Sequence, residues 1–265
     1  ILAGMGDDTI RSGTGDDIID AGDGNDRITG HDGEDTIIGG GGNDTIRGGN
    51  DADDIRGDAG DDKLNGDDGN DTLSGGDGLD QIRAGNGDDT VLGGAGEDIL
   101  RGDSGADVVI GGAGNDRVDG GDGDDILSGE AGIDDLRGGK GDDQIDGGSG
   151  ADVINGGLGN DVITGSAGAD VLKGSQGADV FVFNALEDAG DRLADFSLRD
   201  GDSISVGTLL ESLGTTLDDA IVSETIWLEA GGRNSWLVVD TDGATQIAHL
   251  RNVGVDTAFD ESWIF

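Results

Sequence analysis

The strongest constraint in this sequence is a nine-residue period that runs from Ala3 to Val182 without insertion or deletion. The unit at 111–119, Gly-Gly-Ala-Gly-Asn-Asp-Arg-Val-Asp, is representative. Its sixth position is aspartate in all twenty repeats, its eighth is apolar in all twenty, and its fourth is glycine in nineteen, with Asp51 as the exception. A flexible glycine-rich linker would not keep such residues in fixed phase. The period therefore predicts a solenoid of stacked units.

Each repeat divides into a glycine-rich turn and a short strand centred on the apolar eighth position. Glycine permits the positive φ angles that tight turns require. Side chains alternate along a strand, so Ile46 is expected to face inward while Thr45 and Arg47 face outward. Two repeats then form one coil of 18 residues. We predict an all-β fold, a parallel β-roll with a small β-rich C-terminal cap: a right-handed two-sheet solenoid whose coils stack about 4.8 Å apart.

Composition indicates that an apolar core alone cannot hold this fold together. The chain has 57 glycines, no cysteine and a net charge of −44, and only 33% of its residues are hydrophobic. Such a chain buries too little apolar surface to offset the ordering of its backbone. The charge disfavours nucleic acid and anionic membranes as partners, and no apolar run is long enough for membrane insertion. A hard divalent cation is the expected partner.

The sixth-position aspartates indicate where such a cation would bind. Stacking places aspartates two repeats apart above one another, as Asp98 over Asp116. Carboxylates in such a ladder repel each other, and calcium, with about six to eight oxygen ligands, would relieve the repulsion better than magnesium. Residues 1–182 carry 43 acidic and 11 basic residues, so calcium at up to about eighteen sites, one for each stacked pair, would roughly neutralise the array. Metal binding and folding are expected to be coupled.

Units such as 120–128, Gly-Gly-Asp-Gly-Asp-Asp-Ile-Leu-Ser, resemble the hemolysin-type, or repeats-in-toxin (RTX), nonapeptide over about two thirds of the chain. The resemblance implies a β-roll in which each calcium is held by sixth-position aspartates and turn carbonyls of two stacked loops. The metal-facing residues that it implies are Asp8, Asp17, Asp26, Asp35, Asp44, Asp53, Asp62, Asp71, Asp80, Asp89, Asp98, Asp107, Asp116, Asp125, Asp134, Asp143, Asp152, Asp161, Asp170 and Asp179.

One repeat, residues 48–56, departs from the family pattern, because Asp51 and Ala52 replace the usual glycine and Asx. A non-glycine residue is disfavoured where a turn requires positive φ. We therefore expect this turn not to adopt the usual conformation, and calcium between it and the turns at 30–35 and 66–71 to be missing or displaced.

After Val182 the period ends, and residues 183–265 are expected to form a second domain that caps the roll. Strand-like runs at 225–230, 235–240 and 245–251 are separated by glycine-containing turns. The first domain is residues 1–182.

Several short segments resemble the C-terminal target domains of proteins exported by type I secretion systems. They are 177–183, Ala189-Gly190-Asp191-Arg192, Asp195-Phe196-Ser197 and the acidic, then apolar, terminus 260–265. The resemblance implies the type I secretion machinery as a partner during export, and it implies a secreted or cell-surface location in a Gram-negative bacterium.

No catalytic motif is present, so we expect that the chain is not itself an enzyme. There is no HExxH and no Gly-x-Ser-x-Gly, and Gly139-Lys140 is followed by glycine rather than Ser or Thr. The array begins in mid-repeat, with Ile1 at an eighth position, so we expect a fragment of something longer. The leading interpretation is the C-terminal calcium-dependent folding and export module of a large RTX adhesin. The alternative is the calcium-dependent tail of a secreted RTX enzyme (protease, lipase or epimerase) or toxin.

Outward strand positions differ between odd and even repeats. Those of odd repeats carry cations, Arg11, Arg27, Arg47, Lys63, Arg83, Arg101, Arg117, Arg137 and Lys173. Those of even repeats carry Arg56 as their one cation and a set of apolar residues, Ile18, Ile38, Leu92, Val108, Ile110, Ile126, Val162 and Val180. We predict one basic and one apolar face. The charges can block aggregation, or the apolar even-repeat face can contact another protein.

Overall fold

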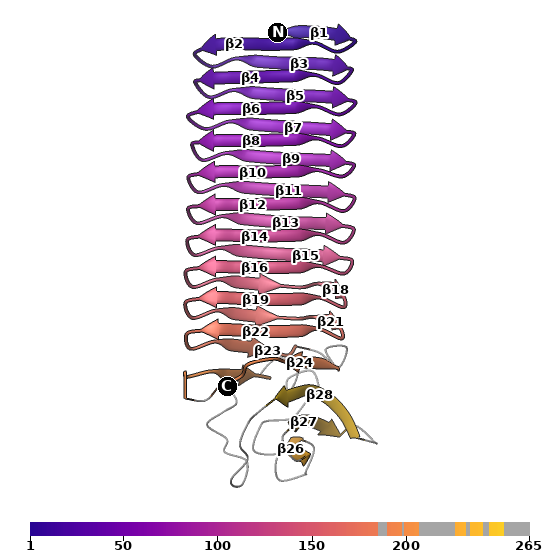
Figure 1. Cartoon of the computed structure of the whole chain (residues 1–265), viewed down its shortest axis with the longest axis vertical. Coiled ribbons are helices and arrows are strands. Elements are labelled where there is room, and N and C mark those ends of the chain that lie inside the picture. Colours follow the sequence, from indigo (N-terminus) through magenta and orange to yellow (C-terminus); the bar gives the residue numbers. More distant parts are fainter. Residues whose placement is uncertain (185–189, 198, 207–225, 232–233, 241–243, 252–265) are drawn as a thin grey trace.

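The computed structural model describes residues 1–184, 190–197, 199–206, 226–231, 234–240 and 244–251. The described chain is a rod of stacked coils in which successive strands alternate between two sheets (Figure 1). All of its regular structure is β, with no helix among the described residues, and therefore no described helix that could cross a bilayer. The predicted two-sheet solenoid is confirmed.

Sheet A contains β1 (Leu2–Met5), β3 (Ile18–Asp23), β5 (Thr36–Gly41), β7 (Asp54–Ala59), β9 (Thr72–Asp77), β11 (Thr90–Ala95), β13 (Val108–Ala113), β15 (Ile126–Ala131), β17 (Gln144–Asp146), β18 (Ser149–Gly150), β20 (Val162–Thr164), β21 (Ala167–Gly168), β23 (Val180–Val182) and β25 (Ser203–Ser205). Sheet B contains β2 (Thr9–Thr14), β4 (Arg27–Asp32), β6 (Thr45–Asn50), β8 (Lys63–Asp68), β10 (Gln81–Asn86), β12 (Ile99–Ser104), β14 (Arg117–Asp122), β16 (Asp135–Lys140), β19 (Val153–Leu158), β22 (Val171–Gln176), β24 (Asp191–Leu193), β26 (Ile226–Gly231), β27 (Asn234–Asp240) and β28 (Ala244–Arg251).

The register confirms the 18-residue coil, since Ile82 pairs with Leu100 and Arg83 with Arg101 in parallel strands. Most strands are six residues long. Pairing skips the first position of the next repeat and continues at its second position, as between Gly85 and Asp103. A strand therefore joins the end of one repeat to the start of the next.

The core lies between the two sheets and consists mainly of the eighth-position side chains. Ile10 is 8% exposed, and the other members of this series, through Phe181, are at most 3% exposed. The first position also faces inward, where Ala21 and Ala84 are fully buried. A core of one medium-sized side chain per repeat is thin, as the composition predicts.

The described residues after the nonapeptides, 183–184, 190–197 and 199–206, form one further coil, which we call the terminal coil. In it β24 pairs with β22 and β25 pairs with β23, both parallel. Its apolar side chains are buried and include two phenylalanines: Phe183, Leu193, Phe196, Ile204 and Val206. The rings of Phe181 and Phe196 pack with centroids 6.1 Å apart. The ladder thus continues where the period has ended.

The three strands predicted beyond this coil are confirmed as β26, β27 and β28. They pair antiparallel in the order β26, β27, β28, and β28 pairs in parallel with β24, which extends sheet B past the terminal coil. The terminus 260–265, which resembles a secretion signal, lies outside the described residues.

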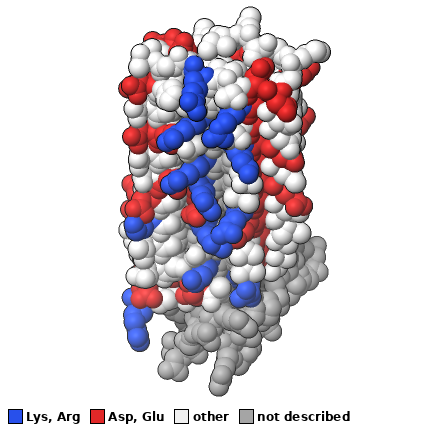
Figure 2. All heavy atoms as spheres, turned by 45° about the horizontal axis from the view of Figure 1, so that its top comes forward, with Lys and Arg blue, Asp and Glu red and all other residues white. Residues whose placement is uncertain are grey.

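The predicted difference between the two faces is also confirmed. Figure 2 shows Lys and Arg gathered in a stripe along the roll, flanked by acidic residues. The odd-repeat cations all lie on strands of sheet B, and the apolar even-repeat residues lie on sheet A. Ile18 is 71% exposed and Ile126 is 48% exposed. Odd and even repeats therefore present chemically different surfaces.

Candidate metal sites

The sixth-position aspartates form a continuous ladder along each edge of the roll. The Asp98 amide donates a hydrogen bond to Asp116 Oδ1 at 2.8 Å, and the Asp116 amide donates to Asp134 Oδ1 at 2.7 Å. The same bond recurs from Asp8, whose amide bonds to Asp26, as far as Asp161, whose amide bonds to Asp179. The predicted stacking of aspartates two repeats apart is confirmed. From Asp26 onward, each carboxylate is oriented by a backbone amide of the preceding coil.

The second carboxylate oxygen of these aspartates is buried and accepts no hydrogen bond. Such Oδ2 atoms belong to Asp26, Asp35, Asp44, Asp53, Asp62, Asp71, Asp80, Asp89, Asp98, Asp107, Asp116, Asp125, Asp134, Asp143, Asp152, Asp161 and Asp179. The residues are at most 3% exposed. A buried carboxylate oxygen without a partner is costly unless a cation or a proton neutralises it. The ladder therefore contains a row of atoms that require such a partner.

Backbone carbonyls face the same spaces as these oxygens. A Cβ built on Gly147 would lie 2.7 Å from Asp152 Oδ2 and 2.8 Å from Gly165 O, which belongs to the next coil. A side chain much larger than a methyl group at this first position would fill the cradle, which explains why the position holds only Gly, Ala or Ser. No three carboxylate or histidine side chains converge among the described residues. A metal here would take most of its ligands from carbonyls, as calcium can.

Burial raises the pKa of the ladder carboxyls. Desolvation lifts the pKa of Asp53, Asp62, Asp125 and Asp143 to about 7, against the opposing effect of the backbone hydrogen bond from the preceding coil. Neighbouring aspartates of the ladder contribute to the increase, because like charges disfavour ionisation. The carboxylate form needs a compensating positive charge, and this is the chemistry of a cation site.

A second, exposed ladder runs through the fifth position of the turns, which the sequence reasoning missed. Asn25 Oδ1 accepts from the Asn43 amide at 2.8 Å, and Asn43 Oδ1 accepts from the Asp61 amide at 3.0 Å. These bonds run in the opposite sense to those of the sixth position. The fifth position is often Asx because its side chain satisfies an amide of the next coil. Alanine at Ala52 removes such an acceptor.

The turn containing Asp51 corrects the expectation of a conformational defect. Asp51 has a positive φ of 73°, and most fourth-position glycines also have positive φ, between 94° and 152°. Aspartate tolerates positive φ better than most residues. The Asp35 amide still donates to Asp53 Oδ1 at 2.8 Å, and the Asp53 amide donates to Asp71 Oδ1 at 2.8 Å. The ladder is continuous through this turn, so the reason for expecting missing calcium there was wrong.

The terminal coil contributes two ladder residues that the sequence reasoning did not identify. The Asp170 amide donates to Asp191 Oδ1 at 2.9 Å, and the Asp179 amide donates to Asp202 Oδ1 at 3.2 Å. Asp202 differs from the array because its Oδ2 accepts from the Ser197 amide at 2.7 Å. The sequence does contain a signal for these two residues, because each lies two residues before an apolar residue, as in the repeats. The segments are Asp191-Arg192-Leu193 and Asp202-Ser203-Ile204, and they follow the last repeat at spacings longer than nine residues.

The model of the RTX calcium-binding nonapeptide repeat matches residues 2–37, 29–64, 65–100, 92–127, 101–136, 128–163 and 156–188. The chain belongs to this family. RTX repeats bind calcium, and the many copies here agree with multiple sites. The RTX β-roll is a structural calcium-binding fold rather than a catalytic one, and RTX proteins are typically secreted by Gram-negative bacteria. No curated protein matches the chain.

Proposed function

We propose that this chain is a module whose folding is driven by calcium, with the sixth-position aspartates as ligands. The observation that carries the proposal is the row of buried Oδ2 atoms that accept no hydrogen bond. In a representative site, Asp98 and Asp116 would hold the ion together with turn carbonyls of their two coils. Bound calcium would supply the positive charge and the coordination that these oxygens lack.

The chain's own residues prepare the sites only when the coils are stacked. Each carboxylate is oriented by an amide 18 residues earlier, as Asp116 is by Asp98. In the unfolded chain these amides and carboxylates are far apart, so no preformed site exists and binding free energy becomes folding free energy. The thin apolar core cannot provide that free energy alone.

Chelation is the direct test. Circular dichroism and hydrodynamic radius should show a disordered, expanded array in EDTA and a compact β-structured rod in millimolar calcium. The same concentration of magnesium should not replace calcium, because magnesium retains its waters and requires a stricter octahedron. If both measurements are the same in EDTA and in calcium, the coupling is refuted.

We further propose that the module supports export and presentation of a large secreted adhesin, with residues 183–265 as cap and secretion target. The pairing of β28 with β24 supports the capping role, because it covers an edge of sheet B. A fusion of residues 183–265 to a passenger protein should be exported by type I machinery, and deletion of 260–265 should abolish export. Export that is unaffected by this deletion would contradict the proposed signal.

The alternative parent is a secreted enzyme or toxin that uses the roll as a calcium-dependent tail. The sequence upstream of Ile1 in the parent gene separates the two: tandem immunoglobulin-like repeats indicate an adhesin, and a catalytic domain indicates an enzyme. In either parent, the exposed apolar residues of sheet A, such as Ile18 and Ile126, offer a contact surface for another domain.

A further inference from the structure

Sheet B carries a polar groove that crosses six strands, from β4 to β14, and encloses about 700 Å³. Each strand contributes residues from the same three repeat positions: the ninth, the second and the third. The groove therefore follows the roll axis rather than any one strand. At a spacing of about 4.8 Å between strands, it extends over about 24 Å. This length suits a segment of a linear polymer.

The floor of the groove alternates between side chains and glycines. His31, Asp67 and Asp103 stand on β4, β8 and β12, and all have positive φ. Gly49 and Gly85 occupy the same position on β6 and β10. The glycines leave bays between the side chains, and equivalent bays recur every two coils, or about 9.6 Å.

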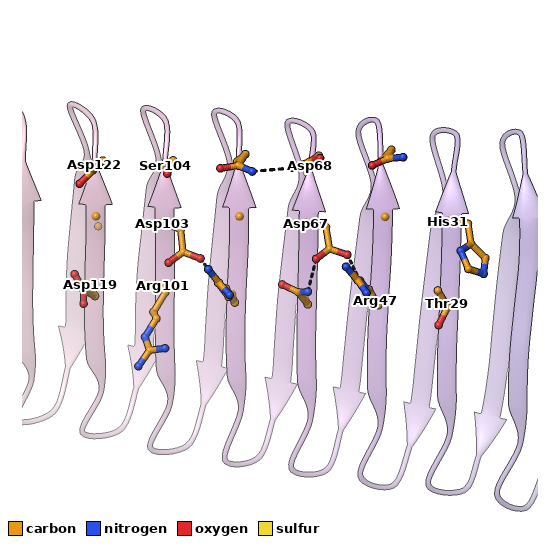
Figure 3. Close-up of a pocket in the computed structure, with 18 of the residues that line it drawn as sticks. Thr29, His31, Arg47, Asp67, Asp68, Arg101, Asp103, Ser104, Asp119 and Asp122 are labelled. Atoms are coloured by element: carbon orange, nitrogen blue, oxygen red, sulfur yellow. Dashed lines mark hydrogen bonds and ion pairs between the residues drawn. The ribbon is translucent and has the colours of Figure 1, made fainter.

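One wall of the groove presents fixed guanidinium groups. Arg47 forms an ion pair with Asp67, and Arg83 forms the equivalent pair with Asp103, two coils further along (Figure 3). Each arginine is thus held beside a bay. Arg101 forms no ion pair with any described residue, so its donors face the solvent that fills the groove. Its side chain is directed away from Asp103 in Figure 3.

The opposite wall presents amides, hydroxyls and carboxylates from the third repeat position. Asn50 Nδ2 donates to Asp32 Oδ1 at 2.7 Å, and Asn86 Nδ2 donates to Asp68 Oδ1 at 2.7 Å. Ser104 continues this row on β12. The wall therefore offers both donors and acceptors, each fixed by a neighbouring coil.

The fold itself does not require these polar side chains. The third position on sheet A is mostly small and apolar, with Gly41, Ala59, Ala95, Ala113 and Ala131 at the ends of its strands. Both sheets belong to the same coils, and their strands pair in the same register. Alanine or glycine therefore suffices for the turn, and the polar wall on sheet B needs another explanation.

We propose that this groove binds a linear, uncharged polysaccharide, with one disaccharide unit for every two coils. Successive sugars of an extended pyranose chain have a spacing similar to that of the strands, about 4.8 Å, and their hydroxyl groups need the mixture of donors and acceptors that the walls provide. The proposal is independent of the calcium sites, which lie on the edges of the roll.

Charge and spacing argue against two other polymers. Carboxylates outnumber the arginines along the groove, with Asp32, Asp67, Asp68, Asp103 and Asp122 among its lining, so a polyanion would be repelled. An extended peptide repeats every two residues over about 6.6 to 6.8 Å, which does not match the spacing of the bays.

The test is calorimetric titration of the calcium-loaded chain with neutral hexasaccharides (cello-, xylo-, manno- and maltohexaose) and with anionic hexagalacturonate. We expect binding of at least one neutral hexasaccharide that strengthens from dimer to hexamer, because the groove spans several sugars. The triple variant Asn50→Ala, Asn86→Ala, Arg101→Ala should bind it at least about tenfold more weakly, since three hydrogen-bonding side chains are lost.

A matched control carries Arg56→Ala and Asp77→Ala, the ninth and third positions of sheet A, and should bind like the parent chain. Calcium titration by circular dichroism checks that every variant folds at the parental midpoint, which separates a failure of the groove from a failure of calcium-driven folding. Binding of none of the neutral hexasaccharides at millimolar concentration, binding of hexagalacturonate alone, or equal binding by the triple variant would overturn the proposal.

Discussion

The nonapeptide array and the terminal coil solve the same stacking problem with different residues. In the array, each coil buries two medium-sized side chains, and most ladder aspartates, such as Asp98, have a buried Oδ2 that accepts no hydrogen bond. In the terminal coil, the core includes Phe183 and Phe196, and Asp202 Oδ2 is satisfied by the Ser197 amide. A ladder carboxylate can therefore be completed by a backbone amide of its own coil, as Asp202 is by Ser197. The nonapeptide turns provide no such amide to the buried Oδ2 atoms, so these atoms need a cation or a proton.

Acid should partly replace calcium in the array, and this is the largest effect that we expect after calcium itself. The folded pKa of Asp53, Asp62 and Asp125 is raised to about 7, above the unfolded value of 3.8. The folded state therefore binds more protons, so its stability without metal is greatest below about pH 4 and is lost as the pH rises through about 7. Circular dichroism in EDTA should show β-structure at pH 4 and its loss at pH 8.

With calcium present, the effect of pH on folding reverses, and acid disfavours the folded state. The reason is that protons compete with the metal for the same oxygens. The calcium concentration at the folding midpoint should therefore rise as the pH falls from 8 to 5. A midpoint that does not change with pH would mean that the buried carboxylates are not the ligands.

Removing an aromatic ring should reveal the greater dependence of the terminal coil on its apolar core. Phe183→Ala leaves a cavity at a fully buried site and should cost about 3 to 5 kcal/mol in denaturant unfolding at saturating calcium. Val118→Ala, in the array, removes less volume and should cost less, about 1 to 3 kcal/mol. Equal losses from the two variants would remove the distinction between the regions.

A central aspartate should matter more than a terminal one. Asp116 stacks on both Asp98 and Asp134, whereas Asp8 stacks only on Asp26. Asp116→Ala should disturb two sites and leave the Asp98 amide without its acceptor, at a cost of about 1 to 3 kcal/mol for the amide alone. Calcium counts and folding midpoints from calorimetry measure the effect.

Asp116→Asn is the matched control, because it keeps an oxygen for the Asp98 amide and removes only the charge. The midpoint of Asp116→Asn should lie between those of the parent chain and Asp116→Ala. If Asp116→Ala and Asp8→Ala have equal effects, the sites are independent and the stacked-ligand geometry is mistaken.

The smallest effect is expected at Asp51, where a left-handed residue interrupts the series of fourth-position glycines. Asp51→Gly should change the free energy of unfolding by no more than about 1 kcal/mol, because relief of the left-handed conformation is offset by a more flexible unfolded chain. Asp51→Val should destabilise by more, at least about 1 to 2 kcal/mol. Thermal unfolding in calcium separates the two. A large stabilisation by glycine would restore the idea of a defective turn.

The sequence was sufficient to predict the coil, both sheets, the ladder and the distribution of charge, because each depends on one residue type at one phase of the period. For example, counting along the nine-residue period is enough to place Ile82 in the core and Asp98 in the ladder. Asp191 and Asp202 could not be placed in this way, since they follow Asp179 at spacings of 12 and then 11 residues instead of nine. Asp51 was misjudged because the preference for glycine was treated as a requirement, although aspartate also populates the left-handed region.

The most direct test of the central claim is a crystal structure of the calcium-loaded protein with anomalous scattering used to locate the ions. We expect a row of calcium ions along both edges of the roll. Each would contact sixth-position carboxylates such as Asp98 and Asp116, and the row would continue through the turn of Asp51. We expect no ion on Asp202 Oδ2, where the Ser197 amide is bonded. Ions confined to exposed carboxylates, with the ladder empty at saturating calcium, would contradict that claim.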